Sequence, residues 1–436
     1  MVLLKIKKGA FIKKIIKKIT LVNPSSVKIS NKNVFKRFLL HLLCLLLFGL
    51  VYLPISKLDS LNPITHTFKD LAFSDIYFSK IRKNTAADTA TSLINIVNIG
   101  RKGKTITRAE ITKFLNAVNN GKFQPKVIGV DVMFESYTDS LTDMELSKAI
   151  KKNNIVMVNK IEEIKDDLFT SISSLKKFQS NHFGFSNQWI EEDKPLTERY
   201  FKPRFQLSNN EIVDHFSLKI AQVYNNDSYE EFCKKDMDNP HLINYRGDYS
   251  KKNRFEINDT TNFKKFKDKI VLIGLYEFGE DKQPLYTEDL HWSPTNERYF
   301  GRSAQNVYGI EIQANIIANI INNDFIIHSK KMNFIIQILF SLLIYFLLLR
   351  FFLRSKFIFT MTKLFLQVFI VASLIVLSLF QIMWFNLYND YTLLVIAAFL
   401  SAELTGLIEA IIDKYFMRIK ELFISTNKDK KNETST

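Results

Sequence analysis

The sequence predicts an α/β protein in which a wound sheet, mixed or mostly parallel, is joined to four transmembrane α-helices. Short β-branched runs predict the strands, because their near-continuous apolarity is typical of strands buried on both faces of a sheet. These runs occupy residues 93–99, 127–132, 155–158 and 270–274. Segments with helical spacing alternate with them, as in a wound sheet. Four apolar runs are each long enough to cross a bilayer, which predicts the membrane helices.

Helices are expected between and after the strands. Thr107-Arg-Ala-Glu110 and Thr142-Asp-Met-Glu145 fit the capping box, in which a Thr and a Glu three residues apart bond each other's main chain. Further helices are expected over 212–224 and 308–321, the second leading almost directly into the membrane. Residues 160–204 are less regular and are expected to hold loops and an inserted hairpin. The helix after Thr107 would face the sheet with Ile111, Phe114, Leu115 and Val118.

The apolar runs divide the chain into a soluble domain and its membrane anchors. We expect an extracytoplasmic domain over residues 56–329, preceded by one membrane helix and followed by three. The first run lacks a small-residue cleavage site, so an uncleaved anchor is predicted rather than a signal peptide. The helices are predicted at 38–55, 333–353, 357–380 and 391–412, with a basic cytoplasmic N-terminus at 1–37 and a short cytoplasmic tail at 413–436.

The net charge of +16 is concentrated outside the soluble domain. Residues 1–57 carry twelve Lys or Arg and no Asp or Glu, whereas residues 58–329 carry 36 basic and 37 acidic side chains. This distribution follows the positive-inside rule, with Lys330-Lys331 as the one flank against it, and it argues against nucleic-acid binding. We therefore predict a multi-pass protein of the bacterial inner membrane, with both termini cytoplasmic, the domain periplasmic and the lipid bilayer as a partner.

Neither a disulfide nor a catalytic centre is expected. Cys44 lies in the first span and Cys233 in the soluble domain, so the two thiols occupy different phases. The sequence has no catalytic motif, phosphate-binding loop or metal-ligand spacing of histidines, so we predict no enzyme, no cofactor and no metal. An acidic run over 277–289 with His291 could hold a hard cation through oxygen ligands, but it lacks EF-hand spacing, and a solvated loop is favoured.

Five segments carry a family resemblance. Residues 126–134 (KVIGVDVMF) are similar to the pattern G-A-x-x-I-G-F-D-x-x-F, and residues 241–247 (HLINYRG) are similar to I-N-Y-R-G. The patterns G-K-I-V-L-I-G, T-P-x-N and G-V-E-x-H-A-N are matched in order by residues 266–274, 293–297 and 309–316. Together these segments, within residues 70–322, resemble the CHASE2 domain, the extracellular sensory module of bacterial membrane receptors. One anchor before the domain and three spans after it is also that family's usual layout.

The resemblance implies that the protein is a sensor or adaptor. The sequence departs from the family's pattern at two places. The family's W-P-W-x-R stands here as Lys104-Thr-Ile-Thr-Arg108, and its His before Ala-Asn is Gln313. The outer domain would bind a ligand or partner, shift the helix over 308–321 and so move the second span. Because only 24 residues follow Ile412, we expect a separate cytoplasmic output protein. The alternative is a structural or envelope-assembly protein whose outer domain docks another membrane protein without a small ligand.

Six residues are candidates for ligand binding. Asp131 follows an apolar strand, where a carboxylate often lines the ligand crevice of an α/β sheet, and Arg108 could reach such an acid. Amide and guanidinium groups at 244–246 and 296–298 suit carboxylate or phosphate recognition. The alternatives are a turn-capping Asp131, a solvated Arg108, and loop anchoring by the other side chains. The candidates are Arg108, Asp131, Asn244, Arg246, Asn296 and Glu297.

Three further side chains are candidates for coupling within the membrane. Glu403 lies near the predicted midplane of the fourth span, where a charge costs at least about 2.5–3.5 kcal/mol and should face other helices or be protonated. His41 and Glu409 have similar predicted depths, so a contact between them would dock the first helix against the last. Snorkelling of Glu409 to the interface explains its position equally well.

Overall fold

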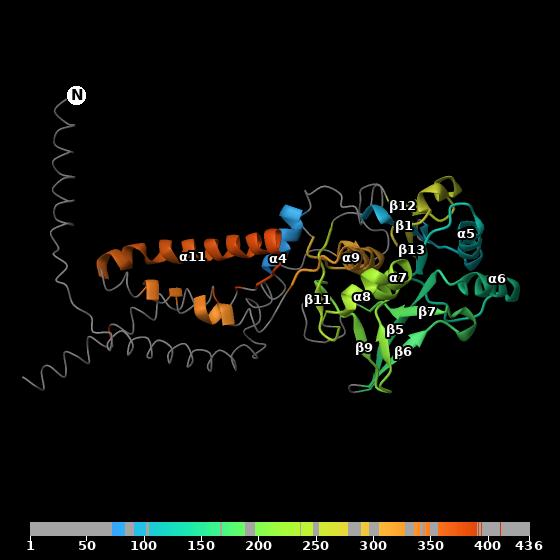
Figure 1. The fold of residues 1–436 in the computed structure, drawn as a ribbon, viewed down its shortest axis with the longest axis horizontal. Coiled ribbons are helices and arrows are strands. Elements are labelled where there is room, and N and C mark those ends of the chain that lie inside the picture. The colour runs from blue at the N-terminus through green and yellow to red at the C-terminus, as the bar shows by residue number, and fades with distance from the viewer. Residues whose placement is uncertain are drawn as a thin grey trace, which may run out of the picture. The chain divides into compact units, whose positions relative to one another are not determined.

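The computed structural model describes residues 72–82, 91–101, 104–165, 168–187, 197–235, 237–246, 253–277, 289–295, 305–327, 335–340, 343–344, 346–348, 356–389, 391, 394 and 410. The chain divides into two compact units. The sheet unit comprises residues 60–333 and 375–390, and the helical unit comprises 1–59, 334–374 and 391–436. The sheet unit has the predicted α/β fold, a mixed, mostly parallel sheet with helices on both faces (Figure 1).

A seven-stranded sheet lies at the centre of the sheet unit, in the order β12-β1-β13-β4-β5-β6, with β7 also paired to β5. All pairings are parallel except that of β5 with β6. Every residue of β1, β4 and β13 is buried, as expected of strands covered on both faces. The four predicted strands are confirmed as β1 (Ile94–Asn98), β4 (Val127–Val130), β5 (Ile155–Lys165) and β13 (Ile270–Gly274). The others are β12 (Arg254–Glu256), β6 (Leu168–Ser173) and β7 (His182–Phe185).

Helices cover the two faces of this sheet in separate clusters (Figure 1). On one face α5 (Arg108–Asn120) and α6 (Ser140–Ile150) pack on β1, β4, β5 and β13. On the other face α7 (Phe216–Tyr224) and α9 (Gly309–Asn322) pack on the same strands. The predicted inward face of α5 is confirmed, because all four of its apolar members are buried in the first cluster: Ile111, Phe114, Leu115 and Val118.

The helix boundaries confirm one predicted capping box, correct the other, and shorten one predicted helix. The Thr107 Oγ1 accepts from the Glu110 N–H, and the Glu110 carboxylate accepts from the Thr107 N–H at 2.9 Å, which completes the first capping box. The second box is wrong: Asp139 is the N-cap of α6 and accepts from the Thr142 N–H at 2.9 Å. An Asp is a strong N-cap and lies earlier in the chain, so the helix begins there. The helix predicted over 212–224 begins only at Phe216, since residues 212–214 form a strand.

The less regular middle of the chain contains the expected hairpin. Beyond its parallel part, β5 continues to Lys165 and pairs antiparallel with β6, which places the hairpin within residues 160–204. Cys233 is a free thiol, and Cys44 lies outside the described residues. The sheet unit also contains α4 (Phe73–Ile76), α8 (Asn226–Cys233), β8 (Tyr200–Phe201), β9 (Arg204–Gln206), β10 (Ile212–Asp214), β11 (His241–Leu242), β14 (Leu290–His291) and β15 (Val307–Tyr308).

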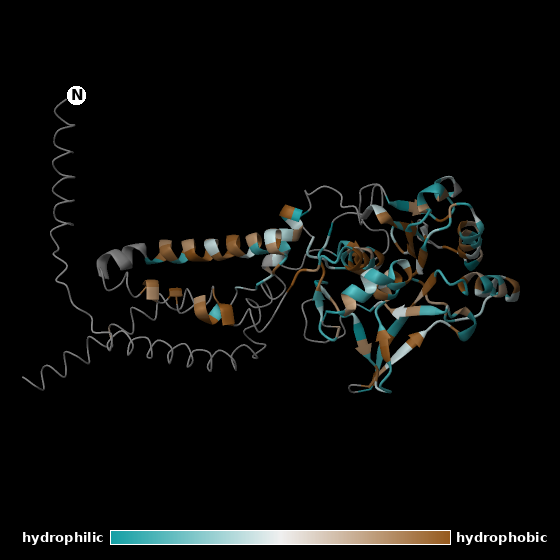
Figure 2. Cartoon of the chain, viewed as in Figure 1, coloured by the Kyte–Doolittle hydropathy of each residue, from teal (hydrophilic) through white to brown (hydrophobic). Residues whose placement is uncertain are grey.

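One helix among the described residues is long and apolar enough to cross a membrane. Within α11 (Lys356–Phe385) the qualifying stretch is Lys363–Phe385, many of whose residues are coloured as hydrophobic in Figure 2. Only 17% of its apolar 18-residue window is buried, whereas the core helix of a soluble protein is mostly buried. The helix runs five residues beyond the predicted span at 357–380 and ends before Asn386, whose φ of 48° is left-handed. The second predicted span is helical at residues 335–340, 343–344 and 346–348. The first lies outside the described residues, and the fourth is described only at 391, 394 and 410.

Candidate functional site

Four ionisable side chains gather where β4 ends. The His291 ring lies between two carboxylates, with Nδ1 3.5 Å from Glu198 Oε1 and Nε2 3.7 Å from Asp289 Oδ1. Asp131, the first residue after β4, interacts electrostatically with both Asp289 and His291. The Asp131 N–H donates to the Ile273 carbonyl at 2.8 Å, which fixes this residue beside the carboxyl end of β13. We call these four residues the charged cluster.

Main-chain pairing brings the members of the charged cluster together. The Glu198 N–H donates to the Trp292 carbonyl at 2.8 Å, so the segment before β8 lies against the end of β14. β14 pairs with β15, which leads directly into α9. The Gly309 N–H at the start of α9 donates to the Asp289 carbonyl at 3.2 Å. A Cβ on Gly309 would lie 2.9 Å from Asp289 Oδ1, so glycine lets this carboxylate approach the first turn of α9.

Two members of the charged cluster, Asp131 and His291, have pKa values raised above their ordinary range. Burial alone would lower the pKa of His291, but the carboxylates of Asp289 and Glu198 outweigh it and raise that pKa to about 9. Burial, followed by the charge of Asp289, raises the pKa of Asp131 to about 7, and the opposing charge of His291 offsets only part of this shift. At neutral pH the imidazole is therefore protonated, and the Asp131 carboxyl is near its midpoint.

Stability should consequently depend on pH through Asp131. A carboxyl whose pKa rises from 3.8 to about 7 on folding binds its proton more tightly in the folded state, so its contribution to stability is lost as the pH rises from 3.8 to about 7. His291 acts in the same sense between 6.5 and about 9. Asparagine cannot ionise, so we expect Asp131→Asn to raise the free energy of unfolding at pH 8 and to change it by almost nothing at pH 4. The expected gain at pH 8 is about 1–2 kcal/mol, less than the full pKa shift implies, because coupled neighbours share that shift.

This expectation is checked by denaturant unfolding of both proteins at the two pH values. The matched control is Glu135→Gln, which removes an exposed carboxylate from the same loop and should leave the pH dependence unchanged. An Asp131→Asn difference of equal size at pH 4 and pH 8 would show that the carboxyl is not perturbed by folding.

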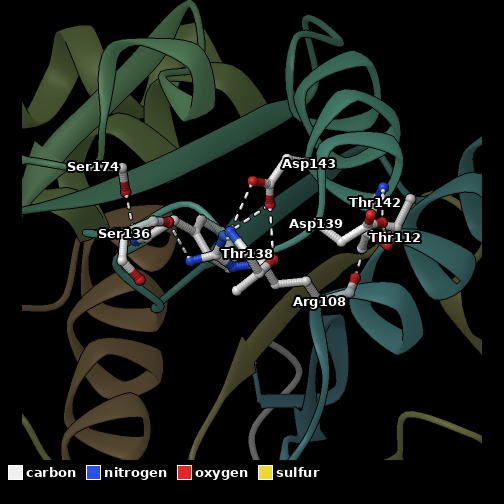
Figure 3. A network of polar contacts seen from close by, with 9 residues as sticks. Arg108, Thr112, Ser136, Thr138, Asp139, Thr142, Asp143 and Ser174 are labelled. Atoms are coloured by element: carbon white, nitrogen blue, oxygen red, sulfur yellow. Dashed lines mark hydrogen bonds and ion pairs between the residues drawn. The ribbon is translucent and has the colours of Figure 1, made fainter.

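Arg108 contacts an acid, but that acid is Asp143 (Figure 3). Its guanidinium donates to Asp143 Oδ1 at 2.8 Å and to the Ser136 carbonyl at 2.6 Å, and it lies over the rings of Phe134 and Phe178 at 5.4 and 5.1 Å. Burial opposes the charge of Asp143, but hydrogen bonds from the Thr138 N–H and Arg108 outweigh it and lower the pKa of that carboxyl. Arg108 therefore fastens the loop that follows Asp131 to α6.

Asn244 and Arg246 contact α9 and the segment after it. The Asn244 N–H donates to Asn319 Oδ1 at 2.8 Å, and the Asn319 amide donates back to the Asn244 carbonyl at 2.9 Å. The Arg246 N–H donates to Asn315 Oδ1 at 2.8 Å, while its guanidinium pairs with Asp324. These contacts correspond to the loop-anchoring alternative raised from the sequence. The other candidates, Asn296, Glu297, His41, Glu403 and Glu409, lie outside the described residues.

Sequence reasoning found part of the charged cluster. Asp131 was a candidate from its place after a strand, and Asp289 and His291 belonged to the acidic run considered as a cation loop. Nothing in the sequence marked Glu198, because its role depends on a pairing with Trp292, about 90 positions further on. Among the described residues no group of three or more His, Cys, Asp or Glu side chains is placed to hold a metal ion.

The segments that carry the sequence resemblance thus lie in one unit: β4 with Asp131, the neighbouring strand β13, and residues 241–246 against α9. A model of the CHASE2 domain matches residues 42–353. The chain belongs to the CHASE2 family. No curated protein and no solved structure matches it. CHASE2 is an extracytoplasmic sensory domain family, and the match runs from within the first predicted span to the end of the second.

Proposed function

We propose that this chain is an integral membrane sensor or adaptor of the bacterial inner membrane. Its CHASE2 domain recognises a ligand or partner outside the membrane, and the membrane helices relay the event to a separate cytoplasmic protein. In this proposal the chain has four spans, both termini are cytoplasmic, and the chain itself carries out no chemical step. The CHASE2 match and the apolar helix α11 support the sensory and membrane parts of the proposal.

The observation that carries the proposal is the position of the charged cluster at the first turn of α9. The cluster lies at the carboxyl ends of parallel strands, where α/β sheets commonly bind ligands. The Gly309 N–H donates to the main-chain carbonyl of Asp289, and the Asp289 carboxylate lies against Gly309, so a displacement of Asp289 by a ligand would reach the first turn of α9. A ligand that favours one arrangement of α9 over another would shift the population between them.

The electrostatics of Asp131 support a binding role. An ionised Asp131 lowers stability at neutral pH, since its pKa is raised to about 7. Groups held in such unfavourable states, by burial together with a specific neighbouring charge, are characteristic of functional sites.

A ligand screen on the full chain in lipid nanodiscs tests the proposal. A panel of small metabolites is screened for an increase in the thermal unfolding temperature, because native-state binding must raise stability. We expect at least one compound to stabilise the wild type, with the shift reduced in Asp131→Asn and retained in Glu135→Gln. A compound that stabilises wild type and Asp131→Asn equally would place recognition away from the cluster.

The second candidate function is envelope assembly, in which the domain docks another membrane protein without a small ligand. Exposed apolar side chains on the β5–β6 hairpin and β10 favour it, namely Ile164, Leu168 and Ile212, with exposures of 72%, 50% and 63%. If no compound stabilises the chain and one membrane protein co-purifies with it stoichiometrically, assembly becomes the better reading.

A further inference from the structure

The segment after α9 pairs with the loop after α11. Ile326 forms an antiparallel bridge with Leu242 of β11, and Ile327 forms a parallel bridge with Leu387. The Ile327 N–H donates to the Asn386 carbonyl at 2.7 Å, and the Tyr388 N–H donates to the Ile327 carbonyl at 3.0 Å. A short main-chain ribbon therefore runs from β8 and β11 through residues 326–327 to the loop that follows α11.

Side chains close the same contact. Ile382 is fully buried and Tyr388 is 3% exposed, and both belong to one apolar cluster with Phe325 and Ile326. That cluster also contains Ile312, Ile316 and Ile320, which are successive inward positions of α9. The outer end of α11 thus shares a core with α9.

The loop at 386–389 is also fixed to its own helix. Asn386 leaves α11 in the left-handed conformation, and the Leu387 N–H donates back to the Gln381 carbonyl at 3.2 Å. The Asn389 amide donates to the Gln381 side chain at 3.1 Å, and the Ser378 hydroxyl donates to the Asn389 carbonyl at 3.3 Å. The loop therefore moves together with the last turns of α11.

We propose that the CHASE2 domain acts directly on the third span, through the contact of residues 325–327 with residues 386–388. The sequence suggests only the second span as a route, because that span follows α9 in the chain. In the structure α9 and the end of α11 share one cluster, and α11 is unbroken over its 30 residues, about 45 Å. A displacement of α9 is passed to the outer end of α11 and along the helix. This inference rests on the proposed sensory function.

The test uses two substitutions of Ile327, whose side chain is 61% exposed and contributes little packing. Ile327→Pro removes the N–H that donates to Asn386, whereas Ile327→Ala, the matched control, keeps it. Hydrogen–deuterium exchange is followed on the full chain in nanodiscs. We expect Ile327→Pro to speed exchange about five- to tenfold both at residues 378–389 and at the end of α9, with Ile327→Ala close to wild type. Faster exchange confined to one of the two segments would overturn the proposal.

A second readout follows the effect along the helix. A spin label on Phe357→Cys, in a background with Cys44 and Cys233 replaced by serine, reports on the far end of α11. The label's mobility should change in Ile327→Pro and not in Ile327→Ala. If exchange becomes faster but the mobility of the label does not change, the contact is only local, and the proposal that α11 transmits the displacement is refuted. Because no ligand enters either experiment, failure of the ligand screen would not be confused with failure of this inference.

Discussion

Arg199→Ala is expected to lower the free energy of unfolding by about 3–5 kcal/mol, because it leaves a buried carboxylate without its counter-charge. The Arg199 Nε donates to Asp75 Oδ1 at 2.8 Å and its Nη2 to Asp75 Oδ2 at 2.6 Å. The two side chains are 5% and 10% exposed, so water cannot replace the lost partner. This pair joins α4, at the start of the described domain, to the segment that carries Glu198. Denaturant unfolding of the full chain in nanodiscs measures the loss.

The double variant Asp75→Ala with Arg199→Ala separates charge from packing. Removing both partners leaves no uncompensated charge, so the double variant should be more stable than the sum of the two single losses implies. Additive losses, or a loss below about 1 kcal/mol in Arg199→Ala, would show that the pair is solvated in the folded protein.

Asn319→Leu is expected to lower the free energy of unfolding by about 2–4 kcal/mol. Asn319 is fully buried, and its amide satisfies both main-chain groups of Asn244. Leucine has nearly the same size but neither donates nor accepts a hydrogen bond, so a buried N–H and a buried C=O would lose their partner. The cost follows from those two orphaned groups rather than from a cavity.

The matched control for this substitution is Asn322→Leu, at the exposed end of the same helix. That change should alter the free energy of unfolding by less than about 0.5 kcal/mol. Hydrogen exchange adds a local readout, since the Asn244 amide should lose protection in Asn319→Leu and keep it in Asn322→Leu. Unchanged protection of Asn244 in Asn319→Leu would contradict the assigned contact.

The sequence was most informative where burial is complete. The run at 270–274 is apolar throughout and coincides with β13, because a strand covered on both faces has no polar side to obscure its limits. The run at 127–132 contains Asp131, and β4 ends just before it, at Val130. Prediction was poorer at helix starts. Thr142 fits a capping box with Glu145, but Asp139, three residues earlier, is the stronger N-cap and is the one that the helix uses.

The candidate site could be predicted only in part, because its members are brought together by long-range pairing. Asp131 was identifiable from the strand before it, whereas Glu198 depends on the bridge between Thr197 and Trp292. Arg108 was a candidate either to reach Asp131 or to be solvated, but its partner is Asp143, which is one turn inside α6 rather than at the end of β4. Pairings of this kind depend on the register of distant segments, on which short motifs carry no information.

The contact between residues 325–327 and 386–388 has a consequence for biosynthesis. Ile382 and Tyr388 complete the cluster around Phe325, yet they are translated more than 50 residues after it, and α11 lies between. The sheet unit therefore cannot complete this cluster until α11 and the loop after it have been synthesised. A protein cut at residue 329 would lack part of its own interior.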